Sequence, residues 1–347
     1  MPRRKLLVVG GTGHFGRLLI DDLLDHAGCD LRVASRRAFR SERFETVVAD
    51  LWDPSSLERA LSGVSIAICA AGPFQELPVS LAEICMRRGI HYMDLADDRG
   101  FVGKIRALAA NKNDGPAICT GWSTVSALSG ALAQVGVEGL NATDSIYIHM
   151  APGNRGARQA ATMASLMYSV GKPFTVFRDG AWHNATGWSE PRDFAFPPPI
   201  GLRRGYLVDV PDHEILPELL GARTVEFRAG SELHLLNRCI SLLRRTRRSW
   251  VGWSAVFQRA AALLSWIGHD WGALGVEVSG SFSRRRISVI ADSAGERIAV
   301  MPASIMASAL LSGAPHHGLV PPAHWLTHKE LRGECEKRGF RLVEEEI

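Results

Sequence analysis

The feature that most constrains this chain is an apolar run leading directly into a glycine-rich turn. Residues 5–9 are apolar at four of five positions and predict a buried strand. The turn that follows reads Gly10-Gly11-Thr12-Gly13-His14-Phe15-Gly16. Apolar residues then recur at helical spacing as far as His26, at Phe15, Leu18, Leu19 and Leu23. We therefore predict a strand, a tight turn and an amphipathic helix.

A strand, turn and helix of this form is typical of dinucleotide-binding domains. Glycine lets a pyrophosphate approach bare backbone, and the N–H groups at the helix N-terminus hold its negative charge. We predict that the whole turn, Gly10 to Gly16, binds a nicotinamide cofactor. The alternative is a glycine turn with a purely structural role, which is common in proteins.

The end of the second predicted strand, residues 31–34, bears on the choice of cofactor. Domains that prefer NAD usually carry an acidic residue here to bind the ribose hydroxyls. This chain has Ser35, Arg36 and Arg37 instead. A guanidinium can pair with a 2′-phosphate, so we expect NADP, with NAD as the alternative. A solvated basic loop would also explain the arginines.

Strands and helices alternate through the first third of the chain, which predicts a parallel sheet with helices on both faces. Asp53 and Pro54 read as the N-cap and first residue of a helix. Asp50 ends the third strand, and Ala71-Gly72-Pro73-Phe74 follows the fourth. Ligands of such sheets bind at the carboxyl ends of the strands, so we predict that these residues also border the cofactor.

Length and composition exclude several classes of protein. The 347 residues suffice for two compact units, and a net charge of +4 is too balanced to indicate nucleic-acid binding. The six cysteines include no C-x-x-C pair and lie mostly in apolar runs, so we expect reduced thiols in a cytoplasmic protein. No signal peptide is apparent. The histidines show no metal-binding spacing, so we expect no metal.

The pattern changes after about residue 140. Residues 174–177 and 181–183 flank Asp179-Gly180 and predict a hairpin. Further strands are predicted at 145–149, 222–228, 275–282 and 286–291, with a helix at 156–170. Thr327 and Glu330 form a capping-box pattern before a last helix and strand. We predict a Rossmann domain at 1–140, an α+β substrate or dimerisation domain at 141–312, and a return to the first domain at 313–347.

Several motifs resemble those of the saccharopine dehydrogenase-like oxidoreductases. They are the glycine turn, Ala71-Gly72-Pro73-Phe74, the run His91-Tyr92-Met93-Asp94-Leu95, Arg155-Gly156 and Arg178-Asp179-Gly180. The resemblance implies a doubly wound Rossmann-type domain with an inserted α+β domain that often dimerises. It also implies NADP or NAD as cofactor. It does not fix the substrate, because the family includes amino-acid, polyamine-pathway and enoyl reductases.

Candidate catalytic residues follow the later strands. Asp94 lies near the carboxyl end of strand five and is a candidate catalytic group, or else a helix cap. Gly121-Trp122-Ser123-Thr124 opens the next predicted helix, where its backbone N–H groups could bind a substrate anion. Among Tyr147, His149, Arg155 and Arg158 we expect one functional residue, with Tyr147 and Arg155 as catalytic candidates and Arg158 for substrate binding. Tyr168 and Lys172 fit a Y-x-x-x-K pattern, but Gly171 and Pro173 break the helix that this chemistry needs.

Residues 244–271 combine arginines with four tryptophans. This composition suits a helix lying on a membrane surface, although a lid or a dimer helix is the simpler interpretation. An apolar lid would suit a lipidic substrate. We expect a cytoplasmic NADP-dependent oxidoreductase acting on a C=N, C=O or C=C bond in the cleft between the domains. The alternatives are a membrane-associated enoyl or lipid reductase and a non-catalytic NADP-binding regulator.

Overall fold

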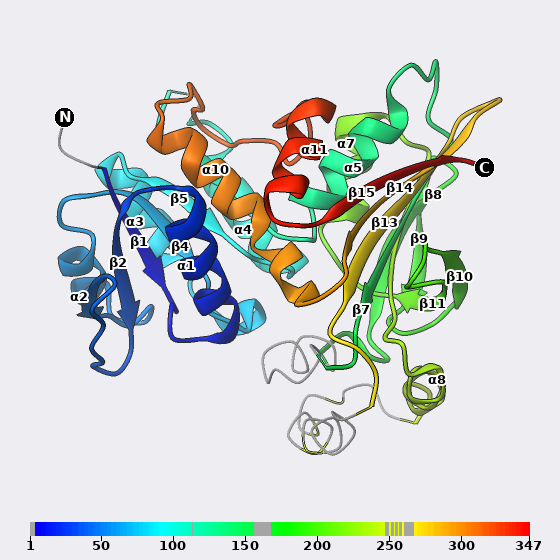
Figure 1. Cartoon of the computed structure of the whole chain (residues 1–347), viewed down its shortest axis with the longest axis horizontal. Helices are drawn as coiled ribbons and strands as arrows, with labels where there is room; N and C mark the ends of the chain where they lie inside the picture. Colours follow the sequence, from blue (N-terminus) through cyan, green and yellow to red (C-terminus); the bar gives the residue numbers. More distant parts are fainter. Residues whose placement is uncertain are drawn as a thin grey trace. The chain divides into compact units, whose positions relative to one another are not determined.

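The chain divides into two compact units in a computed structural model (Figure 1). The model describes residues 4–112, 114–155, 168–246, 250, 253, 256, 259 and 267–347. Unit 1 comprises Met1–Ala127 and Ala299–Pro322, and unit 2 comprises Leu128–Ile298 and Ala323–Ile347. Each unit has its own sheet.

Unit 1 is a Rossmann-type parallel sheet, as the alternation of strands and helices predicts. Within the described residues, its six strands run in the order β3-β2-β1-β4-β5-β6, and every pairing is parallel. Leu6, Leu7 and Val8 of the central strand are fully buried, as expected for a strand covered on both faces. The strands are β1 (Lys5–Val9), β2 (Asp30–Ser35), β3 (Glu45–Val48), β4 (Val64–Cys69), β5 (His91–Asp94) and β6 (Ile118–Cys119).

The helices of unit 1 begin and end at residues that cap them. Asp53 accepts a hydrogen bond from the Ser55 amide and Asp98 accepts one from the Phe101 amide, so each caps the helix that follows. Gly89 ends the third helix with a left-handed φ of 68°. The helices are α1 (His14–His26), α2 (Pro54–Ala60), η1 (Phe74–Glu76), α3 (Ser80–Arg88), α4 (Arg99–Ala109) and α10 (Met301–Leu311).

The C-terminal part of the chain is shared between the two units. Helix α10 packs against α1 and β4. The segment after it runs beside β6, where the Ile118 amide donates to the Gly318 carbonyl at 2.7 Å. The last helix and strand instead belong to unit 2, because β15 pairs with β14. We expected all of 313–347 to return to the first domain. Only the part up to Pro322 belongs to unit 1, and residues 323–347 belong to unit 2.

Unit 2 is built on a mixed sheet. In the described part of the chain its strands run in the order β10-β11-β12-β7-β13-β14-β15, and the β8–β9 hairpin attaches to β12. Among the described strands of this sheet, only β12 and β7 pair in parallel. The strands are β7 (Ser145–Pro152), β8 (Pro173–Arg178), β9 (Ala181–Thr186), β10 (Arg192–Ala195), β11 (Leu202–Leu207), β12 (Thr224–Ala229), β13 (Gly272–Ser279), β14 (Arg284–Ala291) and β15 (Arg341–Glu346).

Helices cover the apolar face of this sheet. Ile146, Val225 and Val278 are fully buried in one row of that face. Gly136 lets α5 approach closely, because an added Cβ would lie 2.5 Å from Cγ2 of Val278. Thr327 and Glu330 form the predicted capping box of α11. The helices of unit 2 are α5 (Ala127–Val137), α7 (Asp212–Leu220), α8 (His234–Leu243), η3 (Gly295–Ala299) and α11 (His328–Lys337).

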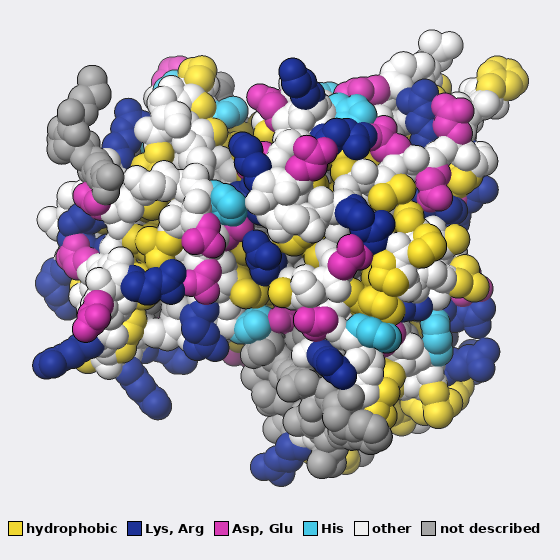
Figure 2. All heavy atoms as spheres, in the orientation of Figure 1, with side chains coloured by type: hydrophobic (Ala, Val, Ile, Leu, Met, Phe, Trp, Pro, Cys, Tyr) yellow, Lys and Arg dark blue, Asp and Glu magenta, His cyan; other side chains and the backbone are white. Residues whose placement is uncertain are grey.

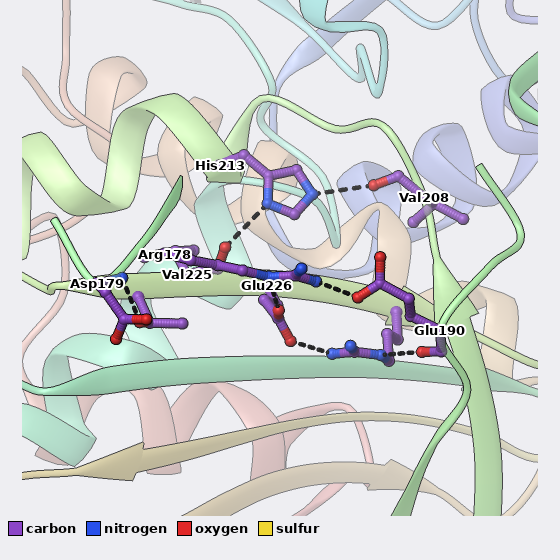
Figure 3. A network of polar contacts seen from close by, with 9 residues as sticks. Arg178, Asp179, Glu190, Val208, His213, Val225 and Glu226 are labelled. Atoms are coloured by element: carbon purple, nitrogen blue, oxygen red, sulfur yellow. Dashed lines mark hydrogen bonds and ion pairs between the residues drawn. The ribbon is translucent and has the colours of Figure 1, made fainter. Parts of the chain in front are cut away.

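The opposite face of the sheet carries buried charges (Figure 3). Glu226 forms ion pairs with Arg178 and with Arg228, whose Nη1 lies 2.5 Å from Oε2. Burial alone would raise the pKa of Glu226, but the two guanidiniums outweigh it and lower the pKa. Both Glu226 and Arg228 are at most 6% exposed, so the loss of one partner would leave a buried charge unpaired.

We predict that Glu226→Gln destabilises the protein by about 3 kcal/mol at pH 7, because Arg228 would lose its counter-charge. A carboxyl group with a lowered pKa contributes stability above its unfolded pKa and loses it as the pH falls. The difference from wild type should therefore shrink below about pH 4. Urea unfolding at both pH values tests this, with the exposed Glu336→Gln as control. Equal stabilities at pH 7 would contradict it.

Candidate functional site

The candidate residues of unit 1 meet at one edge of its sheet. Because all the strands are parallel, their carboxyl ends lie together, and ligands of such sheets bind at that edge. The β1–α1 turn, the residues after β2 and β4, and Asp94 at the end of β5 all lie there. The candidate cofactor residues therefore lie at one edge of the sheet.

Close backbone packing explains two glycines of the β1–α1 turn. Gly10 has a φ of +82°, and an added Cβ would lie 2.6 Å from the amide nitrogen of Ala71. A Cβ on Gly16 would lie 2.3 Å from the Gly10 carbonyl oxygen. Real Cβ atoms do not approach so closely, so both positions need glycine for the fold itself.

Gly13 differs because the fold alone does not require glycine there. Its φ and ψ of −70° and 173° suit any residue. The nearest atom to an added Cβ is the Gly10 carbonyl oxygen, at 3.1 Å, and no other lies within 4 Å. Gly13 and Thr12 are exposed. The N-terminus of α1 has no side-chain cap and no acidic residue in its first turn. Its first amides therefore suit an anion.

Arg17 is a candidate that the sequence reasoning did not include. Its guanidinium donates to the Thr12 carbonyl at 2.6 Å, which holds a positive charge beside the turn. Arg17 follows Gly13 by one helical turn, and this spacing alone would have predicted a positive charge beside the turn. Burial and then the charge of Arg17 lower the pKa of His14, so His14 is neutral at pH 7. The half-buried rings of His14 and Phe15 pack edge to face.

The turn after β2 presents two arginines. The buried hydroxyl of Ser35 donates to the Arg37 carbonyl and fixes this turn. The side chains of Arg36 and Arg37 are exposed, and neither forms an ion pair with another described residue. Both guanidiniums are therefore available to an anionic ligand.

The remaining cofactor candidates differ in their surroundings. Ala71 lies directly against Gly10, and Phe74 is buried against Phe101 with ring centroids 5.2 Å apart. The turn Ala71-Gly72-Pro73-Phe74 thus adjoins the β1–α1 turn. Asp50 follows β3 at the edge of the sheet, and its carboxylate accepts from the Trp52 amide at 3.0 Å. That contact explains Asp50 as a local turn residue.

Asp94 links two strands at the site edge. It is fully buried, and its Oδ1 accepts from the amides of Gly121 and Ala96 at 2.8 and 3.0 Å. Burial raises its pKa to about 6, although these amides and the nearby hydroxyls of Thr120 and Tyr92 oppose the shift. Its Oδ2 has no well-aligned hydrogen-bond partner among the described residues. Asp98, not Asp94, caps α4.

The segment after β6 corrects one expectation. Gly121-Trp122-Ser123-Thr124 was expected to open a helix, but α5 begins only at Ala127. The Ala127 amide donates to the Gly121 carbonyl at 3.2 Å, so residues 121–127 close into a tight loop. Ser123 and Thr124 are buried in this loop. Their amides are therefore not those of a helix N-terminus.

The candidates of unit 2 have their own partners. The ring of Tyr147 lies under the guanidinium of Arg192, whose Cζ is 3.5 Å from the ring centroid. Burial lowers the pKa of His149 to about 3, which keeps it neutral at pH 7. Arg155 is exposed, and its amide donates to the His269 carbonyl. Arg158 lies outside the described residues.

Other expectations concern unit 2 and the chain as a whole. Lys172 lies over the ring face of Tyr168, with Nζ 3.1 Å from the centroid, rather than beside its hydroxyl. Residues 156–167 of the predicted helix 156–170 and much of 244–271 fall outside the described residues. The described residues contain no group of His, Cys, Asp and Glu side chains that could hold a metal. They also contain no helix with the length and apolar character needed to cross a bilayer.

Comparisons with known proteins agree with this geometry. Residues 6–118 match the saccharopine dehydrogenase NADP binding domain family. A search of curated proteins finds no match. Among solved structures, the fold is similar to apo saccharopine dehydrogenase (L-Glu forming) from Saccharomyces cerevisiae. That match has a TM-score of 0.64 and 11% identity, and it covers 99% of this chain and 100% of the other.

A second structure, uronate dehydrogenase from Agrobacterium tumefaciens, matches over a smaller part. It is 21% identical and covers 27% of this chain and 41% of its own, with a TM-score of 0.23. At 11% identity, the yeast structure establishes the fold and not the activity. The family match covers all the parallel strands of unit 1 and their connecting turns. Residues 6–118 of unit 1 thus match the saccharopine dehydrogenase NADP binding domain family.

Proposed function

We propose that the protein is an NADP-dependent oxidoreductase that transfers hydride to or from a C=N, C=O or C=C bond. One observation carries the proposal. Gly13 has dihedral angles open to any residue and lies exposed at an uncapped helix N-terminus, and an added Cβ there would make one tight contact, 3.1 Å from the Gly10 carbonyl oxygen. A diphosphate approaching the backbone would explain this glycine, because its oxygens would occupy the space of a Cβ.

NADP fits the charges at this edge better than NAD does. The exposed guanidiniums of Arg36 and Arg37 follow β2, at the position where the ribose of such cofactors binds. Arg17 adds a positive charge beside the turn. When bound, the cofactor supplies or accepts the hydride, and the protein has to orient it and exclude water. We assign binding of the cofactor to these arginines and to residues 10–16.

In this proposal Asp94 is a positioning residue. Its carboxylate holds the amide of Gly121 and so fixes the loop 121–127 at the site edge. Oδ1 of Asp94 accepts from both backbone amides and the side chain is fully buried, so we assign Asp94 to holding the loop rather than to proton donation. Tyr147 and Arg155 stay candidates for contact with substrate, as does Arg158.

The reaction class is tested by mixing the protein with NADPH and with imines, ketones or enoyl thioesters. Saturable loss of the reduced cofactor with one substrate class is expected. The same assay with Gly13→Ala should show clearly slower turnover at a cofactor concentration that does not saturate the variant. Tight NADPH binding without turnover of any class would contradict the oxidoreductase and favour a regulator that senses NADP.

We predict that Gly13→Ala folds normally but binds NADPH at least about tenfold more weakly, because the new methyl group would displace the diphosphate. Circular dichroism and calorimetric titration measure the two properties. Gly103→Ala is the matched control, because an added Cβ there meets nothing within 4 Å. Wild-type affinity in Gly13→Ala would refute the proposed site.

We predict that Arg36→Asp weakens NADPH binding by about tenfold or more and leaves NADH binding nearly unchanged, because only NADPH carries the 2′-phosphate. Lys104→Asp makes the same change of charge at an exposed position of α4 and should alter neither affinity. The measurement is a titration of each variant with both cofactors. If Arg36→Asp weakens both cofactors equally, the assignment of the 2′-phosphate is wrong.

We predict that Asp94→Asn gains stability relative to wild type as the pH rises from 4 to 8. Because burial raises the native pKa of Asp94 to about 6, its ionisation destabilises the folded state in this range. Asparagine cannot ionise. The difference in free energy of unfolding between the variant and wild type should therefore change by up to about 3 kcal/mol. Urea unfolding measures it, with the exposed Asp25→Asn as control. If the difference in free energy of unfolding did not depend on pH, the raised pKa of Asp94 would be contradicted.

A further inference from the structure

Helix α8 presents leucines to solvent. Leu235 is 76% exposed and Leu242 is 65% exposed, and Cys239 between them is also exposed. Residues spaced by four and by seven lie on one face of a helix, so the three form a continuous apolar stripe. The two leucines are among the most exposed apolar residues of the described chain.

The helix is held to unit 2 by its opposite face. Asn237 and Ile240 are its buried residues. The Asn237 side chain exchanges hydrogen bonds with Ser231. The backbone carbonyl of Asn237 accepts a hydrogen bond from the indole nitrogen of Trp188 at 3.1 Å. The outward stripe therefore plays no part in attaching α8 to the sheet. Substitutions on the stripe should leave the fold intact.

The segment of sequence that contains α8 carries formal charge of a single sign. From residue 233 to residue 269 the sequence contains no aspartate or glutamate. The same stretch contains six arginines, at positions 238, 244, 245, 247, 248 and 259. Arg238 and Arg245 are exposed on and just after α8. Yellow apolar side chains lie at the surface in Figure 2 where Figure 1 shows α8.

We propose that α8 docks on the surface of an anionic lipid bilayer. Leu235 and Leu242 would enter the boundary between headgroups and acyl chains, while Arg238 and Arg245 would bind lipid phosphates and carboxylates. A bilayer offers apolar and anionic groups together over a continuous surface. A second copy of this chain fits less well, because it would bring two sets of arginines together without acidic residues to pair them.

In this proposal α8 lies on the surface of the bilayer and does not span it. Helix α8 has ten residues, about half the length needed to span a bilayer. The exposed stripe together with the basic residues is the pattern of a helix that lies in the plane of the interface. This inference concerns where the protein resides and does not depend on the proposed reaction.

Flotation with liposomes tests the proposal. The full-length protein is mixed with vesicles of phosphatidylcholine alone or of phosphatidylcholine with phosphatidylserine, and circular dichroism confirms that each variant is folded. We expect flotation with the anionic vesicles only. Leu235→Gln with Leu242→Gln, and separately Arg238→Gln with Arg245→Gln, should each reduce the bound fraction about tenfold. The control pair Leu202→Gln with Arg223→Gln changes exposed residues elsewhere in unit 2 and should float like wild type.

A fluorescent probe on Cys239 gives an independent readout. Cys29 is half-buried and is replaced by serine, and the other four cysteines are buried, so a polarity-sensitive dye should label Cys239 selectively. Its emission should shift to the blue on addition of anionic vesicles, and not in the double leucine variant. Absence of flotation, equal flotation on neutral vesicles or unchanged flotation of the leucine variant would overturn the proposal. A loss of dimer in that variant without flotation would instead assign the stripe to contacts between copies.

Discussion

The close approach of the β1–α1 turn to β4 is the contact on which the rest of unit 1 depends. Gly10 packs against Ala71, and Gly16 packs on the Gly10 carbonyl, at distances that exclude a Cβ at either position. This packing directs the N-terminus of α1 to the carboxyl edge of the sheet. The same backbone geometry that brings strand and helix together therefore leaves the first amides of α1 facing the candidate cofactor site.

One face of the unit 2 sheet buries charged side chains instead of apolar ones. Glu226, Tyr147 and Glu277 are aligned across three strands, and arginines surround both carboxylates. Phe194 packs over this face where Gly275 leaves room for its ring. Such a layer is stable only while every charge keeps its partner. Tyr147 lies within this layer, with the guanidinium of Arg192 over its ring.

The sequence predicted the parts of the fold that depend on local signals. The glycine turn, the Asp53 cap, the Asp179-Gly180 hairpin and the Thr327 capping box are all present. Strands β10 and β11 were not predicted because they are short and rich in arginine. Helix α7 contains Pro217, which argues against a helix, and α10 is apolar on all sides and shows no amphipathic period. Their stability comes from tertiary packing, which local patterns do not report.

The sequence could predict at which edge of the sheet the candidate site lies, but not the contacts of each residue there. Parallel topology brings strand ends together, so residues 10–16, 35–37 and 71–74 follow from the order of elements. The amide partners of Asp94 come from a loop 27 residues away, and the start of α5 depends on how that loop closes. The role of Asp94 as a scaffold for the loop required the three-dimensional contacts.

Hydrogen exchange of the backbone amides with and without NADPH tests the central claim most directly. The account predicts that saturating NADPH slows exchange in the peptide spanning residues 10–16, because the diphosphate would accept hydrogen bonds from these amides, and also in the peptide spanning residues 35–37. Tight binding of NADPH with unchanged exchange at residues 10–16 would contradict the account.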